Sequence, residues 1–153
     1  MKKTKTEKIF IDNGFGFPII LLNVPMILIR DIWTPNIDYK KLTSTVLKNL
    51  VIKPTRLTGN EIKFIRLTFE MTLKEFSERF YVTHPCVINW EKEKDNSTNM
   101  NWITEKDIRL FIFDKLSKEE DLRVIYEKLE KEPNNSEYKE PKFDVKKLEL
   151  SYA

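Results

Sequence analysis

The sequence contains very few of the residues that build disulfides, metal centres and tight phosphate-binding loops. Its 153 residues include one Cys, one His and three Gly. A single Cys excludes an internal disulfide, and one His with one Cys falls short of the roughly four ligands of a zinc site. No glycine-rich phosphate loop and no pair of acids with catalytic spacing is present. We therefore expect a protein that is not an enzyme and holds no metal and no cofactor.

Long hydrophobic runs and a large net charge are also missing. The most apolar stretch, FGFPIILLNVPMILI, is shorter than the roughly 20 residues of a membrane helix and is interrupted by Pro18, Asn23 and Pro25. The basic start is not followed by a small-residue cleavage site. We expect a cytoplasmic protein without membrane contact. The net charge of +3 permits a polyanionic partner only where positive charge gathers locally.

The strand signals lie near the N-terminus. The segments EKIFI, GFPIILLN and PMILIRDIW are rich in Ile, Leu and Phe and are bounded by Gly, Asn and Pro. Pro18 and Pro25 cannot donate to a ladder, so we expect them at strand starts or edges. A helix over 36–51 is predicted by apolar residues at helical spacing, namely Tyr39, Leu42, Val46, Leu47 and Leu50.

Helix signals dominate from residue 58. A Thr or Ser followed three residues later by Glu forms a capping box at Thr58–Glu61, Thr72–Glu75 and Ser117–Glu120. Five helices are predicted: 59–69, 73–80, one from Thr83, one within 104–116 and one after Ser117. The side chains expected to point inward are Ile62, Ile65, Phe69, Leu73, Phe76, Phe80, Val87, Trp90, Ile108, Phe111, Ile112, Leu116, Leu122, Ile125, Tyr126 and Leu129.

These patterns predict an α+β fold, mainly α, in three segments. Residues 1–53 form a small β-rich unit with one helix, and 54–116 form a helical domain. Residues 117–153 supply a helix and a mobile charged tail, because the composition after Pro133 is polar and charged. Within the tail, FDVKKLELSY is expected to add a short strand or helix to a partner.

The second and third predicted helices have the spacing of a helix-turn-helix. Apolar residues stand where the two helices must pack, and the small Ser77 stands where they cross. The segment MTLKEFSERFYVTHPCVINWEKEKD resembles the helix-turn-helix of the lambda repressor/Cro (XRE) family. The matching residues are Thr72, Glu75, Val82, Thr83, Val87, Trp90 and Glu91. The resemblance covers about 58–116 and implies a five-helix DNA-binding domain that acts as a dimer on double-stranded DNA.

The recognition hypothesis assigns DNA contacts to eight residues of this segment. The third helix would enter the major groove with His84, Pro85 and Asn89 at the base edges, where Asn can pair with adenine. Phosphates would be bound by Thr72, Lys74, Thr83, Lys92 and Lys94. The resemblance also implies a structural ion pair between Arg66 and Glu91. Two positions depart from the family pattern: Tyr81 stands at a turn position that is usually Gly, and Leu73 where many members have Gln.

The N-terminal pattern GFGFPIILLNVPMILIRDIWTPNIDY, followed by LTGNEIKFIR, resembles MqsA/YgiT-type antitoxins of type II toxin–antitoxin operons. That family joins a small β-rich domain, with zinc on four Cys, to an XRE domain. The resemblance implies a zinc-less antitoxin that represses its own operon and holds an RNase-type toxin by its N-terminal unit.

Two alternatives remain open. One is an XRE-type regulator without a toxin, whose β unit senses a ligand or assembles oligomers. The other is an interaction module that has lost DNA binding, which the near balance of about ten basic and ten acidic residues over 54–115 favours. The apolar stripe in IRLFIFDKL fits either the core of the domain or a dimer contact.

Overall fold

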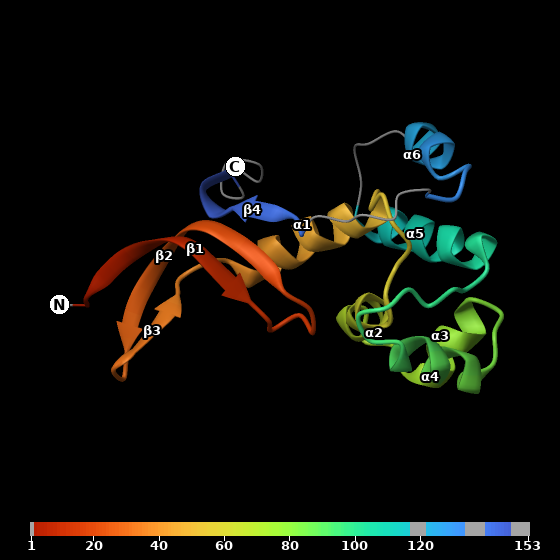
Figure 1. Cartoon of the computed structure of the whole chain (residues 1–153), viewed down its shortest axis with the longest axis horizontal. Helices are drawn as coiled ribbons and strands as arrows, with labels where there is room; N and C mark the ends of the chain where they lie inside the picture. The colour runs from red at the N-terminus through yellow and green to blue at the C-terminus, as the bar shows by residue number, and fades with distance from the viewer. Residues whose placement is uncertain (1, 117–121, 134–139, 148–153) are drawn as a thin grey trace. The chain divides into compact units, whose positions relative to one another are not determined.

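The computed structural model describes residues 2–116, 122–133 and 140–147, and the fold is α+β. The chain divides into two compact units (Figure 1). One comprises 1–45 together with 139–153, and the other comprises 46–138. The division therefore falls inside the helix α1 (Tyr39–Val51), earlier than the expected boundary at residue 53, and the C-terminal segment belongs with the β-rich unit.

The first unit is built on a sheet of β1 (Thr4–Asp12), β2 (Ile19–Ile29), β3 (Ile32–Pro35) and β4 (Lys142–Asp144). The first three strands are antiparallel in the order β1-β2-β3, and β4 pairs with β2 in parallel. The tail segment thus pairs with the chain's own sheet, where we expected it to add to a partner. Phe143 and Val145 explain this, because both bury their apolar side chains there.

Strand β2 runs through Pro25 without a break, although we expected Pro25 at a strand start or edge. Leu28 donates its amide to the carbonyl of Lys3 at 3.0 Å, so the alternating residues 26 and 24 also direct their amides toward β1. Pro25 faces the opposite side, where its carbonyl accepts from Asn36 at 2.7 Å. The last paired residues of β2 and β3 are Met26 and Pro35, so the missing N–H of Pro25 lies just past the end of that ladder. It therefore removes no hydrogen bond from the β1–β2 ladder or from the β2–β3 ladder.

Three residues with positive φ shape β2 and its turn. Arg30 and Asp31 have φ of 49° and 63° and form a two-residue hairpin turn, which divides the single strand expected over 25–33 into β2 and β3. At Asn23, which has φ of 55°, the alternation of buried and exposed side chains along β2 shifts by one residue. The odd-numbered Ile19 and Leu21 are buried before it, and the even-numbered Val24 and Met26 are buried after it.

Helix α1 starts where the Asp38 carboxylate accepts from the amides of Lys40 and Lys41 at 3.0 and 3.3 Å. Four of the five residues predicted to point inward are buried: Leu42, Val46, Leu47 and Leu50. Tyr39 is 41% exposed instead, because its hydroxyl reaches Asp12 at the end of β1, 3.1 Å away.

The second unit contains α2 (Gly59–Thr68), α3 (Leu73–Arg79), α4 (His84–Lys92), α5 (Trp102–Leu116) and α6 (Leu122–Lys128). Residues 54–116 therefore hold four helices, α2 to α5, and α6 is the fifth of the five helices predicted from the residue pattern. The resemblance implied all five within about 58–116, which places the fifth helix too early in the chain. The capping boxes Thr58–Glu61 and Thr72–Glu75 are confirmed. The predicted box at Ser117–Glu120 lies outside the described residues.

The core of this unit matches the predicted stripes in most places. Ile62, Ile65, Phe76, Ile108 and Ile112 are all fully buried. The stripe in α5 thus faces the interior of its own unit, and Phe111 stacks edge-on against Phe69 and Phe80. In α6 the prediction is half wrong: Ile125 and Leu129 are buried, but Leu122 and Tyr126 are 55% and 51% exposed. The helix buries only one narrow stripe of side chains. The exposed Tyr126 ring instead makes a cation–π contact with Lys106, whose Nζ lies 4.1 Å from the ring centroid.

No helix in the described part of the chain is both long enough and apolar enough to cross a membrane.

Candidate nucleic-acid interface

Helices α3 and α4 pack against each other to form the predicted helix-turn-helix (Figure 1). Each begins at a Thr: Thr72 Oγ1 accepts from the Glu75 amide at 3.1 Å, and Thr83 Oγ1 from the Cys86 amide at 3.3 Å. The side chains between the helices are buried, namely Phe76, Ser77, Phe80, Val87 and Trp90. The Ser77 hydroxyl donates to the Lys74 carbonyl, so this small polar group is satisfied where the helices cross.

The turn between the two helices is a Schellman motif. Tyr81 donates its amide to the Glu78 carbonyl at 3.3 Å, and Val82 donates to the Ser77 carbonyl at 2.9 Å. Tyr81 has φ of 57°, the left-handed conformation that glycine usually supplies at this position. Its side chain is 92% exposed. The Tyr at this position therefore completes the Schellman motif at the cost of backbone strain.

The outer face of α4 carries the three residues predicted to meet bases. His84, Pro85 and Asn89 are all exposed. Pro85, Asn89 and Lys92 follow one another at helical spacing and form one stripe along the helix, opposite the buried residues. Pro85 stands in the first turn, where its missing N–H leaves no partner unsatisfied. The structure thus presents an amide side chain and a lysine in line from the N-terminal end of α4.

The five residues predicted to contact phosphates are all exposed, and one of them, Lys92, belongs to this stripe. Thr72 and Thr83 each accept a capping hydrogen bond, and each hydroxyl keeps its own proton to donate. Lys74 lies 4.0 Å from Glu78 in an exposed pair, which contributes little. Lys92 closes α4, and Lys94 follows it with φ of 52°.

The ion pair between Arg66 and Glu91 joins α2 to α4. Arg66 Nε lies 2.8 Å from Glu91 Oε2 and Nη2 lies 3.0 Å from Oε1, so the contact is bidentate. The remaining Arg66 nitrogen, Nη1, donates to the Met71 carbonyl at 3.0 Å, just before α3. A single guanidinium therefore ties together α2, the start of α3 and the end of α4.

Helix α2 also approaches α4 through Gly59. A Cβ added there would lie 2.3 Å from the Trp90 carbonyl oxygen and 2.7 Å from the Lys94 amide nitrogen. The amides of Gly59 and Asn60 donate to the carbonyls of Asn96 and Lys94 at 3.2 and 2.9 Å. The start of α2 is thus fixed against the backbone that follows α4, and this contact requires a residue without a side chain.

The charge of the helix-turn-helix is not positive. Residues 70–95 contain four basic residues (Lys74, Arg79, Lys92, Lys94) and six acidic ones (Glu70, Glu75, Glu78, Glu91, Glu93, Asp95). Arg66 neutralises Glu91 from outside this segment, whereas Arg79 is paired with Asp107 at 3.2 Å. The positive charge of residues 70–95 therefore lies on individually placed side chains and forms no broad positive patch in this segment.

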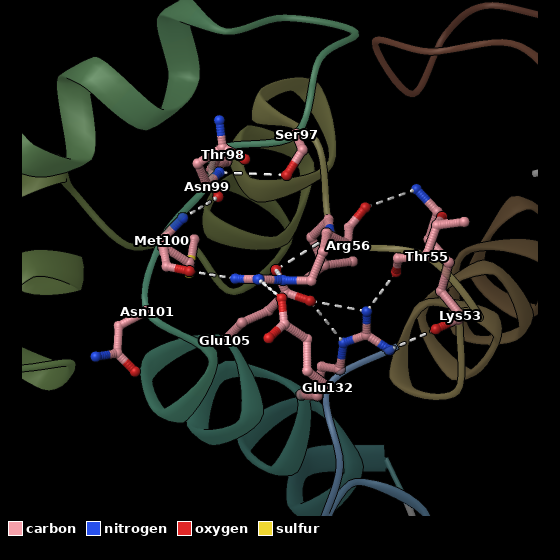
Figure 2. Close-up of polar contacts among 12 residues, drawn as sticks. Lys53, Thr55, Arg56, Ser97, Thr98, Asn99, Met100, Asn101, Glu105 and Glu132 are labelled. Carbon is pink, nitrogen blue, oxygen red and sulfur yellow. Dashed lines mark hydrogen bonds and ion pairs between the residues drawn. The ribbon is translucent and has the colours of Figure 1, made fainter. Parts of the chain in front are cut away.

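The second unit also contains a buried polar network that sequence reasoning missed (Figure 2). Glu105 of α5 is fully buried and accepts from Arg56 Nε at 2.9 Å, the Leu57 amide at 3.2 Å and Arg109 Nη2 at 2.8 Å. Arg56 also donates to the Met100 carbonyl and to Glu132. The signal available in the sequence was the Glu105–Arg109 spacing of four residues, which places a glutamate and an arginine on the same side of a helix.

Arg109 uses all five of its N–H groups. Besides Glu105 they bond the carbonyls of Val51, Lys53 and Thr55, at 3.3, 2.7 and 2.6 Å. Burial lowers the pKa of the Arg109 guanidinium, and the adjacent Glu105 carboxylate opposes this shift. The network joins α5 to the linker that enters α2, so it positions these two helices.

No cluster of three or more His, Cys, Asp or Glu side chains with metal-binding geometry occurs among the residues that the structure describes. Cys86, half-buried on α4, is two residues from His84 and directs its side chain elsewhere on the helix. The chain matches no family model, no curated protein and no solved structure.

Proposed function

We propose that this protein is a sequence-specific DNA-binding transcriptional repressor of the XRE type. The observation that carries the proposal is the division of α4 into two faces: Val87 and Trp90 are buried against the domain, while Pro85 and Asn89 are exposed in line. A recognition helix needs this arrangement, because its inner face must be held rigidly while its outer face reaches base edges.

DNA binding requires more than one copy. The near balance of charge on the helix-turn-helix gives a single copy little attraction for phosphates, and such domains act as dimers on half-sites about one helical turn apart. A homodimer on a pseudo-palindromic operator is therefore part of the proposal.

The proposal extends to an antitoxin that represses its own operon. The support for this step is the resemblance of the N-terminal pattern to MqsA/YgiT-type antitoxins. The sheet of the first unit is held by apolar packing of Leu21, Val24 and Phe143, so a zinc-less version of such a unit is physically sufficient. An adjacent gene for a small RNase-type toxin, whose product co-purifies with this chain, would support it. Without such a gene, the regulator without a toxin is the better account.

One specific observation favours a second candidate, an interaction module without DNA binding. Tyr81 is almost fully exposed at the turn, and acidic residues outnumber basic ones over 70–95. A large exposed aromatic side chain is typical of protein interfaces.

Fluorescence anisotropy distinguishes the two candidates. Labelled DNA from the region upstream of this gene is titrated with the full chain, with scrambled DNA as competitor, at several salt concentrations. Tight binding that the scrambled DNA does not displace supports the repressor. Weak binding with equal affinity for both DNAs and a steep salt dependence would leave only backbone attraction and would contradict it.

A further inference from the structure

One edge of the sheet in the first unit is open. Strand β1 pairs with β2 along its length, and within the described residues no strand pairs with its other side. The strand has nine residues, and nearly all are exposed or half-buried, including Ile9 at 63% and Ile11 at 56%. Unpaired amides and carbonyls on a long edge strand form a template for another strand.

The faces of β1 reverse near its centre, as those of β2 do. The ladder pairs Phe10 with the buried Leu21 and Glu7 with the buried Val24, so Phe10 and Glu7 share the inward face although they are three residues apart. Ile9 and Thr6 consequently share the outward face. The reversal falls at Lys8, opposite Asn23 with its positive φ.

The charges of β1 select a partner of the same sequence. When two copies of β1 are placed antiparallel with Glu7 opposite Lys8, two-fold symmetry repeats this opposite-charge pair. When one strand is moved along the other by one residue, Glu7 lies opposite Glu7 or Lys8 lies opposite Lys8, depending on the direction. Like charges directly opposite each other destabilise a sheet.

The apolar residues fit the same register. Thr6 falls opposite Ile9, and Thr4 opposite Ile11. Opposing residues of an antiparallel pair project to the same face of the sheet. In a regular strand the faces alternate, so Thr6 and Ile9 would project to opposite faces and could not lie opposite each other in such a dimer. The reversal of faces at Lys8 lies at the two-fold axis of the proposed dimer. Because of this reversal, the outward residues of one strand lie opposite the outward residues of the other.

We propose that the edge of β1 is a homodimer interface at which β1 of a second copy pairs antiparallel, with Glu7 opposite the partner's Lys8. The two sheets then form one continuous sheet across the two-fold axis. Glu7 lies 2.9 Å from Lys5 within its own chain, but that pair is about 40% exposed and contributes little to hold Glu7 back. The proposal rests on the homodimer of the proposed function and gives it an interface. Its test is made without DNA, so loss of this interface and loss of DNA recognition are measured separately.

Charge reversal tests it by analytical ultracentrifugation of the full chain. Glu7→Lys places lysine opposite lysine, and Lys8→Glu places glutamate opposite glutamate. Because each change converts two attractive pairs into two repulsive ones, each should weaken dimerisation about tenfold. The double variant Glu7→Lys/Lys8→Glu restores opposite charges at unchanged net charge and should recover the dimer. Lys63→Glu, on the exposed side of α2, is the control for net charge.

Disulfide trapping supplies a second readout that does not depend on affinity. In a Cys86→Ser background, Thr6→Cys combined with Ile9→Cys should form a covalent dimer on mild oxidation, because these positions lie opposite each other. Thr6→Cys combined with Ile11→Cys places the thiols out of register and should not. A monomeric wild type, or a dimer unaffected by both single charge reversals, would overturn the proposal.

Discussion

The guanidinium of Arg66 and the carboxylate of Glu91 are joined by two hydrogen bonds of 2.8 and 3.0 Å, across helices that are 25 residues apart in the chain. Both side chains are about nine-tenths buried. The pair determines how α2 sits on α4, so it connects the stability of the unit to the position of Asn89.

Glu91→Ala should destabilise the protein by about 2 kcal/mol, because it leaves the Arg66 charge buried beside one carbonyl. Glu78→Ala, which removes an exposed carboxylate 4.0 Å from Lys74, is the matched control and should change stability by less than about 0.5 kcal/mol. Urea unfolding followed by circular dichroism measures both. Equal effects would show that the Arg66–Glu91 pair has no structural role.

Tyr81→Gly should stabilise the protein by about 1 kcal/mol, because glycine adopts the left-handed conformation at φ of 57° without strain. The exposed Tyr side chain gives up little packing. The melting temperature should therefore rise. A fall would mean that the Tyr81 ring packs against something that the backbone geometry does not require.

Gly59→Ala should destabilise the protein by roughly 1–3 kcal/mol, because the added methyl group would overlap the backbone of α4. Gly14→Ala is a milder control, since its Cβ would meet only the Asp12 carboxylate, at 3.0 Å. Comparison of the two melting temperatures checks the close approach of α2 and α4. No loss in Gly59→Ala would contradict that approach.

The hydrogen bond from Tyr39 to Asp12 should make stability depend on pH in the alkaline range. Burial, with the adjacent Asp12 carboxylate, raises the pKa of Tyr39 from 10.0 to about 12. The folded state thus binds this proton more tightly than the unfolded chain does, and the stabilisation is complete below pH 10 and lost as the pH rises toward 12.

The difference in the free energy of unfolding between the wild type and Tyr39→Phe should therefore be constant up to about pH 9 and should shrink between pH 10 and 12. The difference between the two proteins in urea unfolding removes the contribution of the lysines, which titrate in the same range. A difference that does not change with pH would show that Tyr39 titrates equally in both states.

The sequence predicted the helix-turn-helix well because its signals are local. Thr72 and Glu75 cap a helix across one turn, and the apolar spacing from Phe76 to Trp90 defines the packed faces within a short segment. The exposure of His84, Pro85 and Asn89 followed from the same periodicity.

The features that the sequence did not predict depend on contacts between distant residues. Phe143 pairs with Leu21 across most of the chain, and nothing near it distinguishes a strand from a tail. Pro25 is tolerated in β2 because the neighbouring ladder has ended beside it, which only the assembled sheet determines. Arg109 resembles any exposed helical arginine until the linker carbonyls are placed around it.

The central claim is that the outer face of α4 distinguishes DNA sequences, and Asn89→Ala tests it most directly. Its affinity for the upstream DNA should be compared with that of Asn96→Ala, an exposed asparagine whose side chain lies off this stripe. Loss of one bidentate base contact should weaken specific binding about tenfold or more in Asn89→Ala, and leave scrambled DNA unaffected. Equal affinities for the two variants on the upstream DNA would contradict recognition by α4.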